Sequence, residues 1–260
     1  MTDAVGLPLA GRAVLVTGAS SGIGRAIAIA AARAGAHVAL TYRANDDGAR
    51  EVEREIRNLG RRAAVIQLDV TDDLSIGALG PAARAALGRL DVWVNNAGAD
   101  ILTGSGASLS AVEKLDRVLA VDLRGTILAS WHAAEMLGAQ EQGGVIINMS
   151  WDHVLTGMPG LNPQIYASVK GGILAFSKSL ARSVAPRVRV NVLAPGWIET
   201  SFGAGLEEHD EGMRRRIAES TPLKRWGTPD DVAGAAVFLA SPAASFLTGQ
   251  TILVSGGVVM

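Results

Sequence analysis

The sequence contains no cysteine, which excludes disulfide bonds, thiolate catalysis and cysteine-ligated metal sites together. Its four histidines are scattered without the H-x-x-x-H spacing that places two ligands on one helix face, so we expect no metal ion. An excess of one charge is lacking too, because 24 basic residues are balanced by 25 acidic ones. Proteins that bind nucleic acid need a strongly basic face. We therefore expect no nucleic-acid partner.

Long apolar runs are also absent, since no stretch approaches the roughly 20 uninterrupted apolar residues that cross a bilayer. Residues 1–12 lack the basic segment followed by an apolar one that marks a signal peptide. We expect a cytoplasmic, soluble protein without a membrane partner. Hydrophobic residues nevertheless make up 48% of the 260 positions, which is enough for a large core.

Short apolar runs alternate with longer helical patterns along the whole chain. The runs lack polar alternation, which is typical of parallel strands covered on both faces. This order predicts an α/β fold: a single Rossmann-type doubly wound domain, residues 1–260, with a parallel sheet of about seven strands and helices on both faces. The predicted strands are 13–17, 38–42, 63–68, 92–95, 145–149, 188–193 and 251–254, and the predicted helices are 24–34, 47–59, 72–87, 111–137, 164–185 and 229–240.

Two segments interrupt this alternation and are predicted to be loops, namely residues 151–163 and 197–226. Each follows the carboxyl end of a strand, where open α/β sheets bind their ligands. The second segment carries an acidic patch at 207–211 and a basic patch at 214–216, which we interpret as a solvated helix face. We expect residues 197–226 to form a lid over the substrate. Its apolar side chains are Trp197, Phe202 and Met213.

The first predicted strand leads directly into T-G-A-S-S-G-I-G, residues 17–24, and then into a helix. Glycine allows the backbone to turn sharply and to approach a ligand closely. The free amides and the positive dipole end of the helix N-terminus attract an anion. Because these glycines stand at the junction of the first strand and first helix, the segment predicts a site for the diphosphate of a dinucleotide.

The end of the second predicted strand indicates which dinucleotide is bound. Enzymes that prefer NAD usually have an acidic residue there to hold the ribose hydroxyls. In this sequence Tyr42 stands at that position and Arg43 follows it, with Ser20 as a neighbouring donor. A guanidinium group can face a 2′-phosphate. NADP(H) is therefore favoured, and NAD(H) remains the alternative if Arg43 is merely solvated.

Further motifs in order along the chain resemble those of the short-chain dehydrogenase/reductase superfamily. Beside the glycine turn there are N-N-A-G at 95–98, Y-A-S-V-K at 166–170 and P-G at 195–196. The resemblance covers essentially the whole chain. The resemblance and the residues discussed above together give one set of expected cofactor contacts. These are Gly18, Ser20, Ser21, Gly22, Ile23, Gly24, Arg43, Asp69, Val70, Asn95, Ala97, Gly98, Tyr166, Lys170, Pro195, Gly196, Ile198 and Thr200.

The resemblance also implies a mechanism for Tyr166 and Lys170. An ordinary tyrosine has a pKa of about 10, which is too high for ready proton exchange at neutral pH. Lys170 stands four residues later, on the same helix face, and its charge lowers that pKa. Tyr166 can then give a proton to a carbonyl or take one from an alcohol. The implied activity is hydride transfer between a nicotinamide cofactor and a small carbonyl or secondary-alcohol substrate.

Two positions depart from the family pattern. The serine that follows the fifth strand and binds the substrate oxygen is replaced by Trp151, and the loop after it is longer. Three interpretations are open: the loop supplies Asp152, His153 or Thr156 instead; the Trp151 indole N–H donates to the oxygen; or efficient chemistry has been lost.

The second departure is Asp122, which stands where the family has an asparagine that supports a proton relay to the lysine. An aspartate there can hold the same water or pair with Lys170, and it adds negative charge near Tyr166. The candidate catalytic residues are therefore Tyr166, Lys170, Asp122 and Asp152. The alternative function is a cofactor-binding sensor or assembly subunit with little turnover. The resemblance also implies a homo-oligomer, a tetramer joined through two long helices and the last strand.

Overall fold

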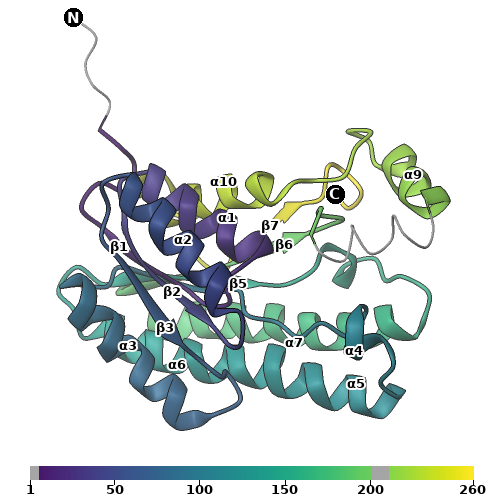
Figure 1. Cartoon of the computed structure of the whole chain (residues 1–260), viewed down its shortest axis with the longest axis horizontal. Helices are drawn as coiled ribbons and strands as arrows, with labels where there is room; N and C mark the ends of the chain where they lie inside the picture. The colour runs from purple at the N-terminus through teal and green to yellow at the C-terminus, as the bar shows by residue number, and fades with distance from the viewer. Residues whose placement is uncertain (1–5, 201–210) are drawn as a thin grey trace, which may run out of the picture.

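The computed structural model describes residues 6–200 and 211–260, and a parallel sheet of seven strands forms its centre (Figure 1). The strand order is β3-β2-β1-β4-β5-β6-β7, so the winding direction reverses between β1 and β4. This confirms the predicted fold. The strands are β1 (Ala13–Val16), β2 (His37–Tyr42), β3 (Ala63–Gln67), β4 (Val92–Asn95), β5 (Gly144–Met149), β6 (Val188–Pro195) and β7 (Thr251–Val254).

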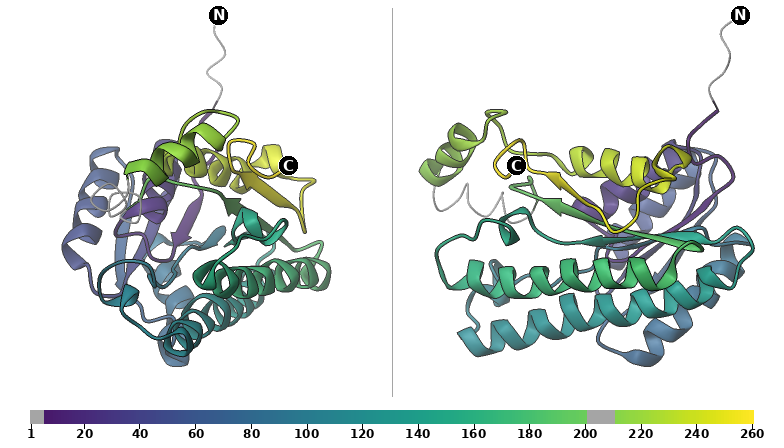
Figure 2. Two further views of the ribbon diagram at one scale, coloured as in Figure 1. Left: turned by 90° about the vertical axis from the view of Figure 1, so that its right-hand side faces the viewer. Right: turned by 180° about the vertical axis from the view of Figure 1, so that it is seen from behind.

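Helices cover both faces of the sheet because the strands are apolar on both sides. Figure 1 and the view from behind in Figure 2 show α1 (Gly22–Arg33), α2 (Asp46–Asn58) and α10 (Pro229–Ala240) on one face. The other face is covered by α3 (Asp73–Leu87), α6 (Gly125–Gly138) and α7 (Leu161–Val184).

Successive residues of β1 point to opposite faces and so belong to different cores. Val14 and Val16 pack with the α1, α2 and α10 side. Ala13 and Leu15 pack with the α3, α6 and α7 side. The fully buried Trp93 of β4 also lies on this second side.

The helix ends carry side-chain caps that hold the connecting loops in place. Asp72 accepts hydrogen bonds from the amides of Leu74 and Ser75 at the start of α3, and Gly88 ends that helix with φ 82°. Thr228 and Asp231 form a reciprocal capping box at the start of α10. Aspartate, serine and threonine at the N-cap bind the free backbone amides of a helix, and glycine at its C-terminal end lets the backbone satisfy the free carbonyls.

The predicted helix over 111–137 is wrong in one respect, because it is three helical segments. These are α5 (Ala111–Val118), a π-helical segment η1 (Leu119–Arg124) and α6. Apolar periodicity does not reveal such a change in winding. Asp122 lies in η1, and π-helical turns often occur at functional sites.

The two predicted loops contain short helices. The segment 151–163 includes η2 (Asp152–Val154) and the start of α7, and 197–226 includes α9 (Glu211–Ser220). Two further short helices, α4 (Gly104–Ala107) and η3 (Pro242–Ala244), are missing from the sequence prediction, because segments of three or four residues are too short to show a helical period. Phe202 and most of the acidic patch, at 207, 208 and 210, lie outside the described residues.

No helix within residues 6–200 and 211–260 is both long and apolar enough to cross a membrane. Within the same ranges, no group of three or more histidine, aspartate or glutamate side chains is arranged to hold a metal ion.

Candidate active site

The turn between β1 and α1 is built by glycines at positions that exclude any larger residue. Gly18 has φ +63°, and a Cβ there would lie 2.8 Å from the Cα of Ala97. A Cβ on Gly24 would overlap the Gly18 carbonyl oxygen and the Asn96 amide nitrogen. The Thr17 hydroxyl oxygen accepts hydrogen bonds from the Asn96 and Ala97 amides at 3.0 Å each. The turn and the N-N-A-G segment therefore form one rigid unit.

The first turn of α1 suits an anion. Ser21 is its N-cap residue and makes no capping hydrogen bond, and this turn holds no acidic side chain. No side chain of the described residues therefore caps the N-terminus of α1, and its first amides can bind a diphosphate. This observation, together with the glycine contacts, fits the predicted dinucleotide.

A cavity of about 600 Å³ extends from this turn to Tyr166. Arg43, Asp69, Asp122, Lys170 and Thr200 are among its lining residues. Hydrogen bonds from the Thr71 hydroxyl and amide lower the pKa of the Asp69 carboxyl, so this group is an anion. Of the predicted cofactor contacts, the cavity brings together Gly18, Ser20, Ser21, Ile23, Gly24, Arg43, Asp69, Val70, Ala97, Gly98, Tyr166, Lys170 and Thr200.

Asn95 is a predicted cofactor residue that the structure places elsewhere. Its side chain is buried, accepts a hydrogen bond from Trp93 Nε1 at 2.8 Å and donates to Asn148 Oδ1 at 2.8 Å. The next residue, Asn96, lines the cavity instead and donates to the Gly18 carbonyl at 3.0 Å. Neighbouring residues at a strand end face opposite ways, so one position decides which amide meets a ligand. The N-N-A-G motif contains both asparagines, so it pointed to the right segment without showing which of the two faces the cavity.

Gly22 does not line this cavity, although a Cβ on it would come within 3.7 Å of the Thr200 methyl carbon. Pro195, Gly196 and Ile198 line a second, adjacent cavity of about 570 Å³. Ile23, Tyr166 and Lys170 line both cavities, so the two are parts of one cleft.

Tyr166 and Lys170 lie on one face of α7, at the junction of the two cavities. The Tyr166 hydroxyl donates to the Ala99 carbonyl at 3.2 Å, and the Ala99 amide donates to Asp122 Oδ1 at 2.8 Å. The other oxygen of Asp122 lies 2.9 Å from Lys170 Nζ. Asp122 therefore contacts the lysine directly and also fixes the backbone that holds Tyr166.

Burial raises the pKa of Tyr166 well above its ordinary value of about 10, and the negative charges of Asp122 and Asp100 raise it further. The Ile101 amide and Arg117 oppose this shift and lower the pKa. A neutral phenol is thus the stable form in the ligand-free chain.

Trp151 stands after β5, where the sequence predicted a departure. Its ring lines the 570 Å³ cavity and lies 6.4 Å from the ring of Tyr166, centroid to centroid. Ser150 also lines the cavity, but its hydroxyl donates to the Lys170 carbonyl at 2.8 Å. Trp197 and Met213, from the predicted lid, line the same cavity.

Asp152 and His153 lie behind the cavity wall that the Trp151 ring forms. Asp152 is fully buried, and its Oδ1 accepts from the His153 amide at 2.7 Å and lies 2.6 Å from His153 Nδ1. Neither residue is among the described residues that line the cavity. The geometry therefore gives no support to the interpretation in which the loop delivers Asp152 to the substrate oxygen. The reason is that η2 turns the chain inward directly after Trp151.

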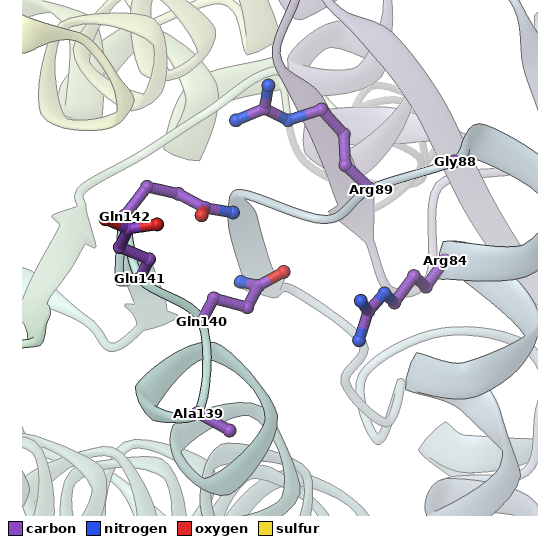
Figure 3. A pocket seen from close by; sticks show the side chains of 7 residues that line it. All are labelled: Arg84, Gly88, Arg89, Ala139, Gln140, Glu141 and Gln142. Atoms are coloured by element: carbon purple, nitrogen blue, oxygen red, sulfur yellow. The ribbon is translucent and has the colours of Figure 1, made fainter.

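Another cavity, of about 750 Å³, lies at the opposite end of the strands, near the amino ends of β4 and β5 (Figure 3). Figure 3 shows Arg84 and Arg89 on one side of it and Gln140 and Gln142 on the other. These residues precede the amino ends of β4 and β5, whereas parallel sheets bind ligands at their carboxyl ends. Arg89 is already paired with Asp91 at 2.5 Å. Volume alone therefore does not identify the active site.

Comparisons with known proteins agree with this geometry. A family model described as enoyl-(acyl carrier protein) reductase matches residues 18–259. The chain is 37% identical over 253 residues to 3beta-hydroxysteroid dehydrogenase 1 of Eggerthella lenta, covering 97% of this chain and 95% of that protein. It is 37% identical over 251 residues to an L-rhamnose 1-dehydrogenase (NAD(P)(+)) of a Sphingomonas species, covering 96% of this chain and 97% of that protein.

Solved structures give the same picture. A 7 alpha-hydroxysteroid dehydrogenase in complex with NADH and 7-oxo glycochenodeoxycholic acid superposes with a TM-score of 0.87 at 33% identity. The match covers 100% of this chain and 98% of that one. A short-chain dehydrogenase/reductase from Serratia marcescens superposes with a TM-score of 0.85 at 32% identity, covering 97% and 100% of the two chains.

Proposed function

The chain belongs to the short-chain dehydrogenase/reductase superfamily, whose members resembling it are oxidoreductases, and we propose on this premise how its own residues act. It transfers hydride between NADP(H) and a carbonyl or secondary alcohol, with Tyr166 as the general acid and base. The observation that supports this proposal is that Tyr166 and Lys170 line both cavities of the cleft, one of which is also lined by the glycine turn between β1 and α1.

Tyr166 moves the proton. In the reducing direction its hydroxyl donates to the carbonyl oxygen, and in the oxidising direction the phenolate accepts the alcohol proton. The bond to Ala99 is 3.2 Å long, at the weak end for a hydroxyl donor, so a substrate oxygen can replace that carbonyl. A nicotinamide ring, when bound, supplies or accepts the hydride.

Lys170 and Asp122 set the charge around this phenol. The Lys170 ammonium stabilises a phenolate, and Asp122 opposes it while holding the ammonium at 2.9 Å. The pair also limits where Lys170 can reach, because both side chains are largely buried. We assign Asp122 as a positioning residue that acts on Tyr166 through Lys170 and Ala99.

Arg43 selects NADP(H) over NAD(H). It lines the cavity together with Ser20, so the two can hold a 2′-phosphate, and Tyr42 provides no carboxylate for ribose hydroxyls. Asp46, in the next helix turn, is paired with Arg50 at 3.4 Å. This pairing reduces its repulsion of a phosphate.

Two features favour the second candidate function, a cofactor-binding protein with little turnover. Burial and Asp122 raise the pKa of Tyr166, and Trp151 lines the cavity at the position where the family resemblance implies a serine that binds the substrate oxygen. Titration of the chain with NADPH, followed by turnover on a panel of ketones, separates the two functions. Tight NADPH binding with no turnover, unchanged in Tyr166→Phe, would favour the second.

We also propose that the protein is a homotetramer, as the family resemblance implies. On the face formed by α6 and α7, Trp131 is 55% exposed and packs edge-on against Phe176 with ring centroids 6.3 Å apart. Met260 at the chain end is fully exposed. Large exposed apolar side chains of this kind often lie at subunit contacts. Light scattering coupled to gel filtration tests this, and a monomeric mass would refute it.

A further inference from the structure

Trp151 forms a wall of the substrate cavity within reach of Tyr166. Its ring lies 5.0 Å from the His153 ring, centroid to centroid, at an interplanar angle of 23°, which is a stacked arrangement. Its other neighbour in the cleft is Tyr166 at 6.4 Å. Trp151 therefore stands between His153 and the place where a substrate oxygen meets the phenol.

His153 is itself held firmly in place. Asp152 fixes its ring through the 2.6 Å contact at Nδ1, and the ring of Trp197 packs edge-on against it at 6.3 Å. Asp152 is anchored in turn by complete burial against Gly196, because a Cβ on that glycine would lie 2.8 Å from Asp152 Oδ2. The Asp152 contact at Nδ1 and the packing of Trp197 together hold the His153 ring as a fixed support for Trp151.

Much of the rest of the cavity is apolar, although Asn162 and Thr200 also line it. Its lining includes Leu102, Met149, Met158 and Met213. The only charged side chain among the described residues that line it is Lys170, and Asp122 already pairs with that ammonium. An anionic substrate would therefore find only this already paired ammonium among the described lining residues.

From this arrangement we infer that Trp151 is a specificity-determining residue that presents an aromatic face to a neutral, ring-shaped ketone or secondary alcohol. The inference rests on the proposed function, since the substrate oxygen is taken to lie at Tyr166. A cavity of about 570 Å³ accommodates a ring compound with apolar substituents. Asp152 and His153 are positioning residues, because they act on the substrate only through Trp151.

The test compares ketones that differ in one property each. Cyclohexanone and 2-hexanone have the same number of carbons and differ in the ring, and 4-oxocyclohexanecarboxylate adds a negative charge. We expect kcat/KM with NADPH to be at least tenfold higher for cyclohexanone than for either other ketone. Binding of each ketone to the chain–NADPH complex is measured by calorimetry in parallel, so that slow turnover does not obscure the order.

Substitutions at Trp151 separate its face from its N–H group. Trp151→Ala should raise KM for cyclohexanone about tenfold and remove its advantage over 2-hexanone. Trp151→Phe keeps a face but no donor, so the ratio between the two ketones should persist while kcat/KM falls about threefold. If kcat instead falls as far in Trp151→Phe as in Trp151→Ala, the indole N–H is a hydrogen-bond donor and the inference is wrong. Phe246→Leu, at a fully exposed aromatic side chain that does not line the cavity, serves as the matched control.

The role of His153, which supports the Trp151 ring, is tested by separate substitutions. His153→Ala should raise KM for cyclohexanone with little change in kcat, and His153→Phe, which restores a stacking ring, should recover much of that loss. Equal affinity for the three ketones in the unaltered chain would overturn the inference even with NADPH bound. Absence of NADPH binding would instead refute the proposed function, so the two failures are distinguishable.

Discussion

The Lys170 ammonium lies 2.9 Å from Asp122 Oδ2, and both side chains are nearly buried. The same carboxylate accepts the Ala99 amide at 2.8 Å, and the Ala99 carbonyl accepts the Tyr166 hydroxyl. One aspartate thus contacts two of the groups that control the proposed proton transfer. It also lies in the π-helical segment η1, which changes the winding between α5 and α6.

This relationship predicts a pH dependence. Because the pKa of Tyr166 is raised, the phenolate is scarce at neutral pH, so alcohol oxidation should increase with pH through the alkaline range while ketone reduction persists at neutral pH. Asp122→Asn removes one of the charges that raise this pKa, and Asp100, Arg117 and Lys170 remain. The rising limb of kcat/KM for oxidation should move down by about one pH unit.

The control for that shift is Asp73→Asn, which removes an exposed carboxylate paired with Arg124 at 2.8 Å. Its pH profile should match that of the unaltered protein. An Asp122→Asn profile that stays in place, or moves to higher pH, would show that Asp122 does not act on the phenol.

Removal of the phenol should stop the chemistry and leave cofactor binding. Tyr166→Phe should lower kcat for ketone reduction by about 10² to 10⁴-fold, the usual size of a general acid contribution. The NADPH dissociation constant, measured by fluorescence, should change by less than about threefold, because the ring is kept and only the hydroxyl is lost. Full activity in Tyr166→Phe would show that another group is the general acid.

Substitution of Arg43 should change the cofactor preference. Arg43→Gln should weaken NADPH binding about tenfold or more, since a charge-assisted hydrogen bond to the 2′-phosphate is lost, and should leave NADH binding nearly unchanged. Arg33→Gln on α1, where the arginine faces Glu55 at 3.5 Å, is the control for general loss of positive charge. Equal weakening of both cofactors would contradict a role for Arg43 in selectivity.

The glycine turn predicts contrasting effects of two similar substitutions. Gly24→Ala places a Cβ against the Gly18 carbonyl and the Asn96 amide, so both NADPH affinity and the melting temperature should fall. Gly234→Ala lies within α10 with no heavy atom within 4 Å of the new Cβ, and it should stabilise the chain by up to about 1 kcal/mol. Calorimetric melting checks both, and a harmless Gly24→Ala would disprove the close contact.

The parts of the site that the sequence predicted are those that local chemistry dictates. The glycine turn must follow the first strand, and Tyr166 and Lys170 share a helix face because they are four residues apart. Other features depend on contacts between distant segments. The choice of Asn96 over Asn95 as the cavity residue depends on how β4 is oriented against its neighbours, Ser130 and Asn148.

Asp152 and α9 show why the remaining features were beyond sequence analysis. The sequence placed Asp152 near the site but could not tell that η2 turns it inward to meet His153 and Gly196. The helix α9 is highly charged and has only a weak apolar stripe, so its periodicity did not distinguish it from a loop.

By itself, the sequence determined the order of apolar strands and helices, the diphosphate turn and the tyrosine–lysine pair, because each depends on residues that are close together in the chain. Only the tertiary structure decided that Asp122 meets Lys170 and that Trp151 stands before a buried Asp152–His153 pair. Asp122 follows β4 and Lys170 follows β5, and Asp152 is buried against Gly196, which follows β6. The geometry of these contacts is set by how the sheet and its covering helices pack, which no local pattern of residues encodes.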